Sequence, residues 1–180
     1  MDNSLETHER YMRSALLEAE KAFNNEEVPV GSVIVYEDKI IARAHNQREM
    51  LSDPTAHAEM IAITQAASYL ENWRLTGVTI YITLEPCLMC LGAIFEARID
   101  TVVFGASDTK ERGCTALDIV GKSEINRKLN IIPNMLEQEC KSILQGFFRD
   151  KRPNSDRQYQ PENFQLKVDY LKEYQPISGA

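Results

Sequence analysis

The chain has 180 residues, of which 43% are hydrophobic and 26% are charged, and its formal net charge is −7. This length suffices for one domain with its own core, and the acidic balance argues mildly against a broad nucleic-acid-binding surface. The first twenty residues are charged and contain no apolar run, so we expect no secretory signal, and no stretch predicts a membrane span. We therefore expect a globular, cytoplasmic protein.

The first part of the chain predicts a helix, a hairpin and a second helix. Residues 4–24 carry apolar side chains at steps of three or four, which is typical of an amphipathic helix. Two β-type runs, 32–36 and 40–44, flank a short polar turn and predict a hairpin. A break at Pro54 precedes residues 56–70, where apolar residues on most sides indicate a buried helix.

The second part of the chain alternates strands with helices. Strands are predicted at 78–83, 101–104 and 130–132, and helices at 86–96 and 136–149. Such alternation favours parallel strands joined by crossover helices, here behind the hairpin. The predicted fold class is α/β, a three-layer α/β/α sandwich with a mixed five-stranded sheet.

The domain is predicted to span residues 1–153. Residues 108–118 are expected to form a loop within it. Residues 154–180 are polar with weak periodicity, and we interpret them as an appended, partly ordered C-terminal tail.

Two short motifs carry the chemistry, His57-x-Glu59 and Pro86-Cys87-x-x-Cys90. Cysteines three apart on a helix lie on one face within reach of a single ion, and a position in the first turn lowers the pKa of a thiol. His57 and Glu59 are only two apart, so they can serve one site only where their helix begins. The motifs therefore predict a site at helix N-termini.

The residue types predict catalytic zinc, one ion per subunit. Three protein ligands, His57, Cys87 and Cys90, would leave a fourth position for water, which is the arrangement of catalytic rather than structural zinc. Two thiolates offset the charge of the ion, so the water is acidified less than at an all-histidine site and needs a base. Glu59 is the candidate base, and it could carry the proton to a ring nitrogen and then to a leaving amine.

Other interpretations of the cysteines are open. A Cys-x-x-Cys pair alone also fits a redox pair or half of a structural zinc site, which Cys114 and Cys140 could complete. However, Cys140 falls on the apolar face of its predicted helix, which favours a core position, and Cys114 falls in the predicted loop. The joint presence of both motifs, about 30 residues apart, favours catalytic zinc.

The paired signature resembles that of the cytidine and nucleotide deaminase superfamily, H-x-E followed by P-C-x-x-C. Within it, residues 5–152 are similar to the bacterial tRNA-specific adenosine deaminases (the TadA family). Beyond the metal motifs, the similarity rests on Val28-Pro29-Val30-Gly31, His45-Asn46, Asp53-Pro54-Thr55-Ala56, Asn72-Trp73-Arg74-Leu75, Thr83-Leu84-Glu85, Val103-Phe104-Gly105-Ala106, Asp108-Thr109-Lys110, Glu139-Cys140 and Phe147-Phe148-Arg149.

This resemblance implies a homodimeric enzyme that hydrolyses adenosine at C6 to inosine, at the wobble position of the tRNA anticodon. It implies that Asn46 grips the target nucleotide, that Ala58 offers a backbone contact beside the metal, and that Leu84 forms an apolar wall of the base pocket. The implied contacts with the anticodon stem–loop are Asp108, Lys110, Phe147, Phe148 and Arg149. Residues 111–117 differ from the small, glycine- and alanine-rich loop usual there, and the tail has no counterpart in the family pattern.

The charges are distributed unevenly, which bears on RNA binding. Residues 1–27 hold seven acids against three bases, whereas residues 141–157 hold five bases against two acids. A basic, aromatic-bearing helix end suits a stem–loop. Cations are also favoured at any helix C-terminus, with or without RNA.

Two alternative functions share part of this pattern. Deaminases of a free base or nucleoside, such as guanine, cytosine or a pterin, share the metal motifs and the Asn that precedes them. A non-catalytic partner subunit, as in heterodimeric eukaryotic relatives, would lack the glutamate. Glu59 is present, which argues against that second alternative.

Overall fold

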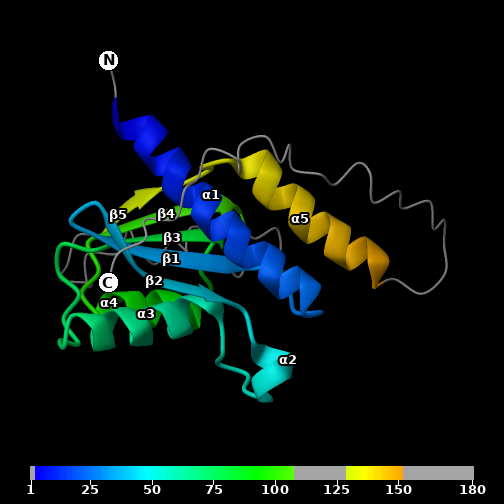
Figure 1. The fold of residues 1–180 in the computed structure, drawn as a ribbon, viewed down its shortest axis with the longest axis horizontal. Helices are drawn as coiled ribbons and strands as arrows, with labels where there is room; N and C mark the ends of the chain where they lie inside the picture. The colour runs from blue at the N-terminus through cyan, green and yellow to red at the C-terminus, as the bar shows by residue number, and fades with distance from the viewer. Residues whose placement is uncertain (1–2, 108–128, 152–180) are drawn as a thin grey trace, which may run out of the picture.

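A computed structural model of the chain describes residues 3–107 and 129–151, in which one sheet lies between two layers of helices (Figure 1). The elements are α1 (Asn3–Asn24), β1 (Gly31–Tyr36), β2 (Lys39–His45), α2 (Arg48–Leu51), α3 (Ala58–Tyr69), β3 (Thr79–Leu84), α4 (Leu88–Glu96), β4 (Thr101–Ala106), β5 (Asn130–Ile132) and α5 (Glu137–Asp150). Helices α1 and α5 pack on one face of the sheet, and α3 and α4 pack on the other. The predicted three-layer sandwich is confirmed.

The sheet combines an antiparallel hairpin with parallel strands, in the order β2-β1-β3-β4-β5. Strand β1 pairs antiparallel with β2 and β3, whereas β3, β4 and β5 run parallel. The hairpin turns at Glu37 and Asp38, whose φ angles of 47° and 59° are those of a two-residue primed turn. Both the hairpin and the parallel pairing through α4 agree with the prediction.

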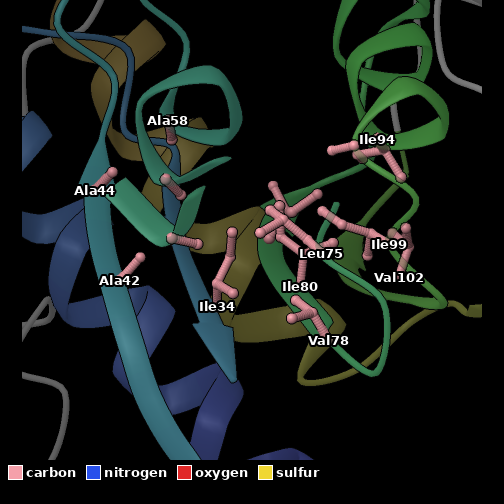
Figure 2. Close-up of a cluster of buried hydrophobic side chains, with 14 of the residues drawn as sticks. Ile34, Ala42, Ala44, Ala58, Leu75, Val78, Ile80, Ile94, Ile99 and Val102 are labelled. Carbon is pink, nitrogen blue, oxygen red and sulfur yellow. The ribbon is translucent and has the colours of Figure 1, made fainter. Parts of the chain in front are cut away.

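Strand side chains alternate between two hydrophobic cores. On β1, Ile34 belongs to the core under α3 and α4, while Val33 and Val35 belong to the core under α1 and α5. Figure 2 shows the first of these cores, in which Ile34 and Ile80 from the sheet lie near residues of the covering helices. The buried residues of α3 are three alanines and one glutamate (Ala58, Glu59, Ala62 and Ala66), so the prediction of burial on most sides holds for one face only.

Several element boundaries differ from those predicted. The short helix α2 occupies a segment for which no helix was predicted, and α3 and α4 begin two residues later than predicted, at Ala58 and Leu88. The predicted loop at 108–118 and the predicted tail at 154–180 lie outside the described residues. Within the described ranges, no helix is both long and apolar enough to cross a membrane.

Cys140 is a core residue, as its position on the predicted apolar face indicated. It is fully buried between α5 and the sheet, and its thiol donates to the carbonyl of Met135 at 3.9 Å. Burial raises the pKa of Cys140 to about 12, which keeps the thiol protonated at neutral pH.

Helix α1 lies directly against the first residue of β1. A Cβ built on Gly31 would collide with backbone atoms of Ala15, Glu18 and Ala19 on the helix. Backbone atoms cannot rotate away as a side chain does, so this helix can lie on the sheet here only because residue 31 is glycine.

We expect Gly31→Ala to lower the free energy of unfolding by about 3 kcal/mol, because the added methyl group overpacks a rigid contact. Urea unfolding followed by circular dichroism measures this. Gly92→Ala is the matched control, since a Cβ there meets nothing within 4 Å and alanine favours the helix. Equal unfolding midpoints for Gly31→Ala and the wild type would contradict the close approach of α1.

Candidate active site

Two helices begin close together and bring His57 and Cys87 face to face. His57 is the N-cap residue of α3, with φ −73° and ψ 152°, and Cys87 is the N-cap residue of α4, with φ −73° and ψ 172°. Neither side chain caps its own helix. Instead, the Nδ1 atom of His57 lies 3.8 Å from the sulfur of Cys87 and 3.5 Å from the sulfur of Cys90.

The spacing of these three side chains fits a zinc ion. Their ligand atoms all lie within 4.8 Å of one another. Tetrahedral zinc with ordinary Zn–S and Zn–N bonds places its nitrogen and sulfur ligands about 3.6 Å apart, close to the two observed separations. One nitrogen and two sulfurs are also a donor set that suits zinc. The predicted ligand cluster of His57, Cys87 and Cys90 is present.

The two cysteines differ in position and in protonation. Cys87 precedes α4 as its N-cap residue rather than lying in its first turn, and Cys90 is the buried third residue of the helix. A hydrogen bond from Cys90 lowers the pKa of Cys87 to about 3, and the same bond raises the pKa of Cys90. The lowering predicted at this helix start is found at Cys87, where the hydrogen bond from Cys90 is its largest cause, and is not found at Cys90.

Glu59 stands beside the cluster, at the second residue of α3. Its side chain is buried, and it is hydrogen-bonded to Cys90. Burial raises the pKa of Glu59, so this carboxyl group takes up a proton more readily than an exposed one. The hydrogen bond with Cys87 raises the pKa of His57.

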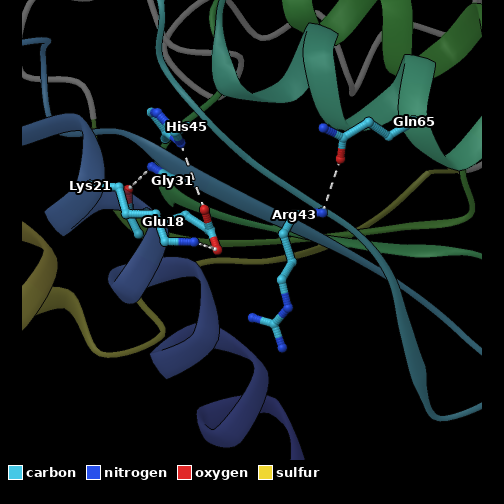
Figure 3. Close-up of polar contacts among 7 residues, drawn as sticks. Glu18, Lys21, Gly31, Arg43, His45 and Gln65 are labelled. Carbon is cyan, nitrogen blue, oxygen red and sulfur yellow. Dashed lines mark hydrogen bonds and ion pairs between the residues drawn. The ribbon is translucent and has the colours of Figure 1, made fainter. Parts of the chain in front are cut away.

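The three predicted pocket residues lie on different parts of the chain. Ala58 is the fully buried first residue of α3, Leu84 is the partly buried last residue of β3, and Asn46 is buried directly after β2. The end of β2 is held from both sides (Figure 3). Buried Glu18 on α1 lies 2.8 Å from Lys21 and 3.7 Å from His45, and the backbone N–H of Arg43 donates to Gln65 of α3 at 3.2 Å.

The predicted RNA-contact residues of α5 divide into one buried and two exposed side chains. Phe147 is 6% exposed and packs edge-on against Phe23, whereas Phe148 is 45% exposed and Arg149 is exposed as well. The end of α5 reaches the turn after α1, where Lys151 donates to the carbonyl of Glu26 at 3.2 Å. The other two predicted contacts, Asp108 and Lys110, lie outside the described residues, as does Cys114.

Two residues near the site were not singled out from the sequence. Glu27 is buried and accepts hydrogen bonds from the segment that follows β2. Arg48 is exposed on α2, and its charge is close enough to His57 to oppose, to a small extent, the rise in the pKa of that imidazole. The only sequence signal was their proximity to the motifs at 28–31 and 45–46.

Comparison with known proteins gives consistent matches over most of the chain. A family model described as MafB19-like deaminase matches residues 6–152. The tRNA-specific adenosine deaminase of Bacillus subtilis (strain 168) is 46% identical over 146 residues, 80% of this chain and 90% of that protein. A structure from a study of A-to-I editing by tRNA:A34 deaminases at the wobble position has a TM-score of 0.71 at 37% identity and covers 75% of this chain and 99% of the other.

A guanine deaminase from Nitrosomonas europaea shares the fold, with a TM-score of 0.64 at 18% identity and coverage of 77% of this chain and 83% of the other.

We expect Cys90→Ala to abolish stoichiometric zinc binding, because it removes one of three clustered ligands. Zinc per chain, measured by atomic absorption after dialysis, tests this. Cys140→Ala is the control, since that thiol lies in the core under α1 and α5. Zinc loss from the control equal to that from Cys90→Ala would contradict the three-residue site.

Proposed function

Because this chain belongs to the MafB19-like deaminases and, among them, to the tRNA-specific adenosine deaminases, we propose that it hydrolyses adenosine to inosine at the wobble position of a tRNA anticodon. The observation that carries the chemistry is the His57–Cys87–Cys90 cluster with the buried carboxyl group of Glu59 beside it. The reaction adds water across the N1=C6 bond of the adenine ring and then breaks the bond from C6 to the amino group, which is released as ammonia.

The protein residues hold the reacting groups and move the protons. A zinc ion bound by the cluster would lower the pKa of a water molecule and so make it a better nucleophile. Glu59 would accept a proton from the attacking water and deliver it to N1 of the ring, and would then carry the proton of the new C6 hydroxyl to the amino group, which leaves as ammonia. The raised pKa of Glu59 suits both steps, because the carboxyl group must hold the proton between them.

Three residues are proposed to hold the nucleotide. Asn46 would hydrogen-bond to it, and Leu84 would pack against the base. Ala58 would contribute its backbone N–H, which belongs to the first turn of α3, where the helix itself supplies no acceptor. The burial of Asn46, and the position of Ala58 next to His57 in the chain, support this assignment.

RNA contacts are proposed on the side where α5 ends. Phe148 is the exposed ring suited to stacking on a base, and Arg149 and Arg48 are exposed cations suited to phosphates. Phe147 would support Phe148 from below, since the two rings are in edge-on contact with centroids 5.5 Å apart. Asp108 and Lys110 remain proposed contacts from the loop.

We further propose a homodimer with one zinc ion per subunit. Helix α3 supports this, because Met60, Ile61 and Ile63 keep part of their apolar surface exposed, although Ile61 and Ile63 also pack against the core, and Tyr69 at its end is exposed. A tRNA substrate is also consistent with the expected cytoplasmic location.

The zinc-loaded protein should be incubated with an anticodon stem–loop carrying adenosine at the wobble position, and in parallel with free guanine and cytidine. We expect inosine in the RNA, detected by mass spectrometry of nucleosides, and no ammonia from either small molecule. Ammonia from guanine or cytidine with unchanged RNA would instead support a free-base or nucleoside deaminase.

We expect Glu59→Gln to keep bound zinc and to lose about 100- to 10,000-fold in kcat, because the amide cannot transfer the proton. Single-turnover conversion of the stem–loop and zinc per chain measure the two effects. Glu71→Gln is the control, an exposed glutamate just beyond the other end of the same helix. Undiminished turnover in Glu59→Gln would exclude the proton-transfer role.

A further inference from the structure

The carboxylate of Glu27 is hydrogen-bonded through both oxygens to the segment between β2 and α3. Its side chain is 1% exposed. One oxygen accepts from the side-chain amide of Asn46 at 3.0 Å, and the other accepts from the backbone N–H of Met50 at 2.8 Å. These partners are 19 and 23 positions away in the chain.

The first bond decides which end of the Asn46 carboxamide faces Glu27. A carboxylate is an acceptor only, so Asn46 must turn its NH₂ group toward it. The carbonyl oxygen of Asn46 is then directed away from Glu27 and offers an acceptor on its other side. Such an acceptor selects a hydrogen-bond donor, for example a ribose hydroxyl.

The second bond holds the loop that leads to the metal ligand His57. Met50 is the third residue of α2, whose N-cap residue Gln47 makes no side-chain cap, so Glu27 supplies the missing acceptor from outside. The same loop is closed onto the start of α3, because the N–H of Gln47 donates to the carbonyl of Ala56 at 3.0 Å.

The burial of Glu27 is not explained by a gain in stability. Neither partner in the two bonds is charged, and within residues 3–107 and 129–151 no cation forms an ion pair with it. A buried carboxylate without a cation costs folding free energy, whereas an amide of the same shape costs less. A role other than stability is therefore indicated.

We propose that Glu27 is a positioning residue for deamination, which sets the hydrogen-bonding direction of Asn46 and the place of the 46–51 segment. The proposal rests on the proposed function, because it takes Asn46 as a substrate contact. Glu27 itself acts only through Asn46 and the loop.

Glu27→Gln tests this with minimal change in shape. Glutamine has one acceptor oxygen for two donors, so it must turn an NH₂ group toward either Asn46 or Met50. We expect unchanged zinc content and an unfolding midpoint equal to or above that of the wild type. We expect KM for the stem–loop to rise at least about tenfold, the effect of one misdirected hydrogen bond, with kcat within about threefold.

Glu26→Gln is the matched control, the same change at the adjacent but exposed position. It should leave zinc, stability and both kinetic constants unchanged. A fall in the unfolding midpoint of Glu27→Gln together with a fall in kcat and no rise in KM would assign Glu27 a merely structural role.

Reversing the polarity of the pair gives a second, independent test. In the double variant Glu27→Gln with Asn46→Asp, the glutamine NH₂ donates to the aspartate, whose other oxygen still accepts from the substrate. We expect this variant to have a kcat/KM at least about threefold above either single variant, whereas Asn46→Asp alone opposes two carboxylates. If the fold-loss of kcat/KM in the double variant equals the product of the fold-losses in the two single variants, the two side chains act independently and the proposal is overturned.

The wild type and Asn46→Ala separate this inference from the function itself. If the wild type acts on a free base instead of RNA, the proposed function fails. The kinetic constants of the same Glu26, Glu27 and Asn46 variants, measured with that base as substrate, then test the positioning role of Glu27. If Asn46→Ala is fully active, the substrate role of Asn46 fails and the positioning role with it. If Asn46→Ala is impaired while Glu27→Gln is not, only the positioning role is wrong.

Discussion

The active site depends on two helices that begin next to each other, with His57 and Cys87 as their N-cap residues. The backbone of an N-cap residue is extended, so its side chain points away from the body of the helix. Neither His57 nor Cys87 forms a hydrogen bond that caps its own helix. Both therefore reach the space between the helix ends, which Cys90 enters from the third position of α4. The positive ends of two helix dipoles meet in this space, which favours thiolate ligands.

The sheet keeps those helix ends in place. Because β3 and β4 are parallel, the connecting helix α4 packs on one face of the sheet. Helix α3 packs on the same face through its buried alanines, whose small side chains allow a close approach to the sheet. On the opposite face, glycine at position 31 allows α1 to lie directly on β1. Both faces are covered by helices, and the proposed substrate contacts Asn46, Ala58 and Leu84 lie at or beyond the ends of the strands.

Chemistry and substrate choice are separable in this molecule. The metal cluster and Glu59 lie at the starts of two helices, as N-cap or first-turn residues, whereas Asn46 follows β2 and Phe148 and Arg149 belong to α5. A guanine deaminase shares the fold at 18% identity, which shows that this architecture alone does not define a substrate. We therefore propose that the selection of an RNA adenosine depends on segments outside the metal cluster, such as the end of α5, where Phe148 is exposed and its ring contacts the buried ring of Phe147.

The sequence determined the elements and the metal ligands, because both are local properties. Periodicity within ten or twenty residues marks a helix or a strand, and the spacing of His57, Glu59, Cys87 and Cys90 requires helix starts wherever the chain folds. Tertiary structure decided which of two neighbouring glutamates is buried. Glu26 and Glu27 are neighbours of the same residue type, so the sequence does not distinguish them. In the structure Glu26 has a positive φ of 60° and is exposed, whereas Glu27, the next residue, is buried. The partners of Glu27 lie 19 and 23 residues away, and only the packing of β2 and α2 beside the end of α1 brings them within hydrogen-bond distance.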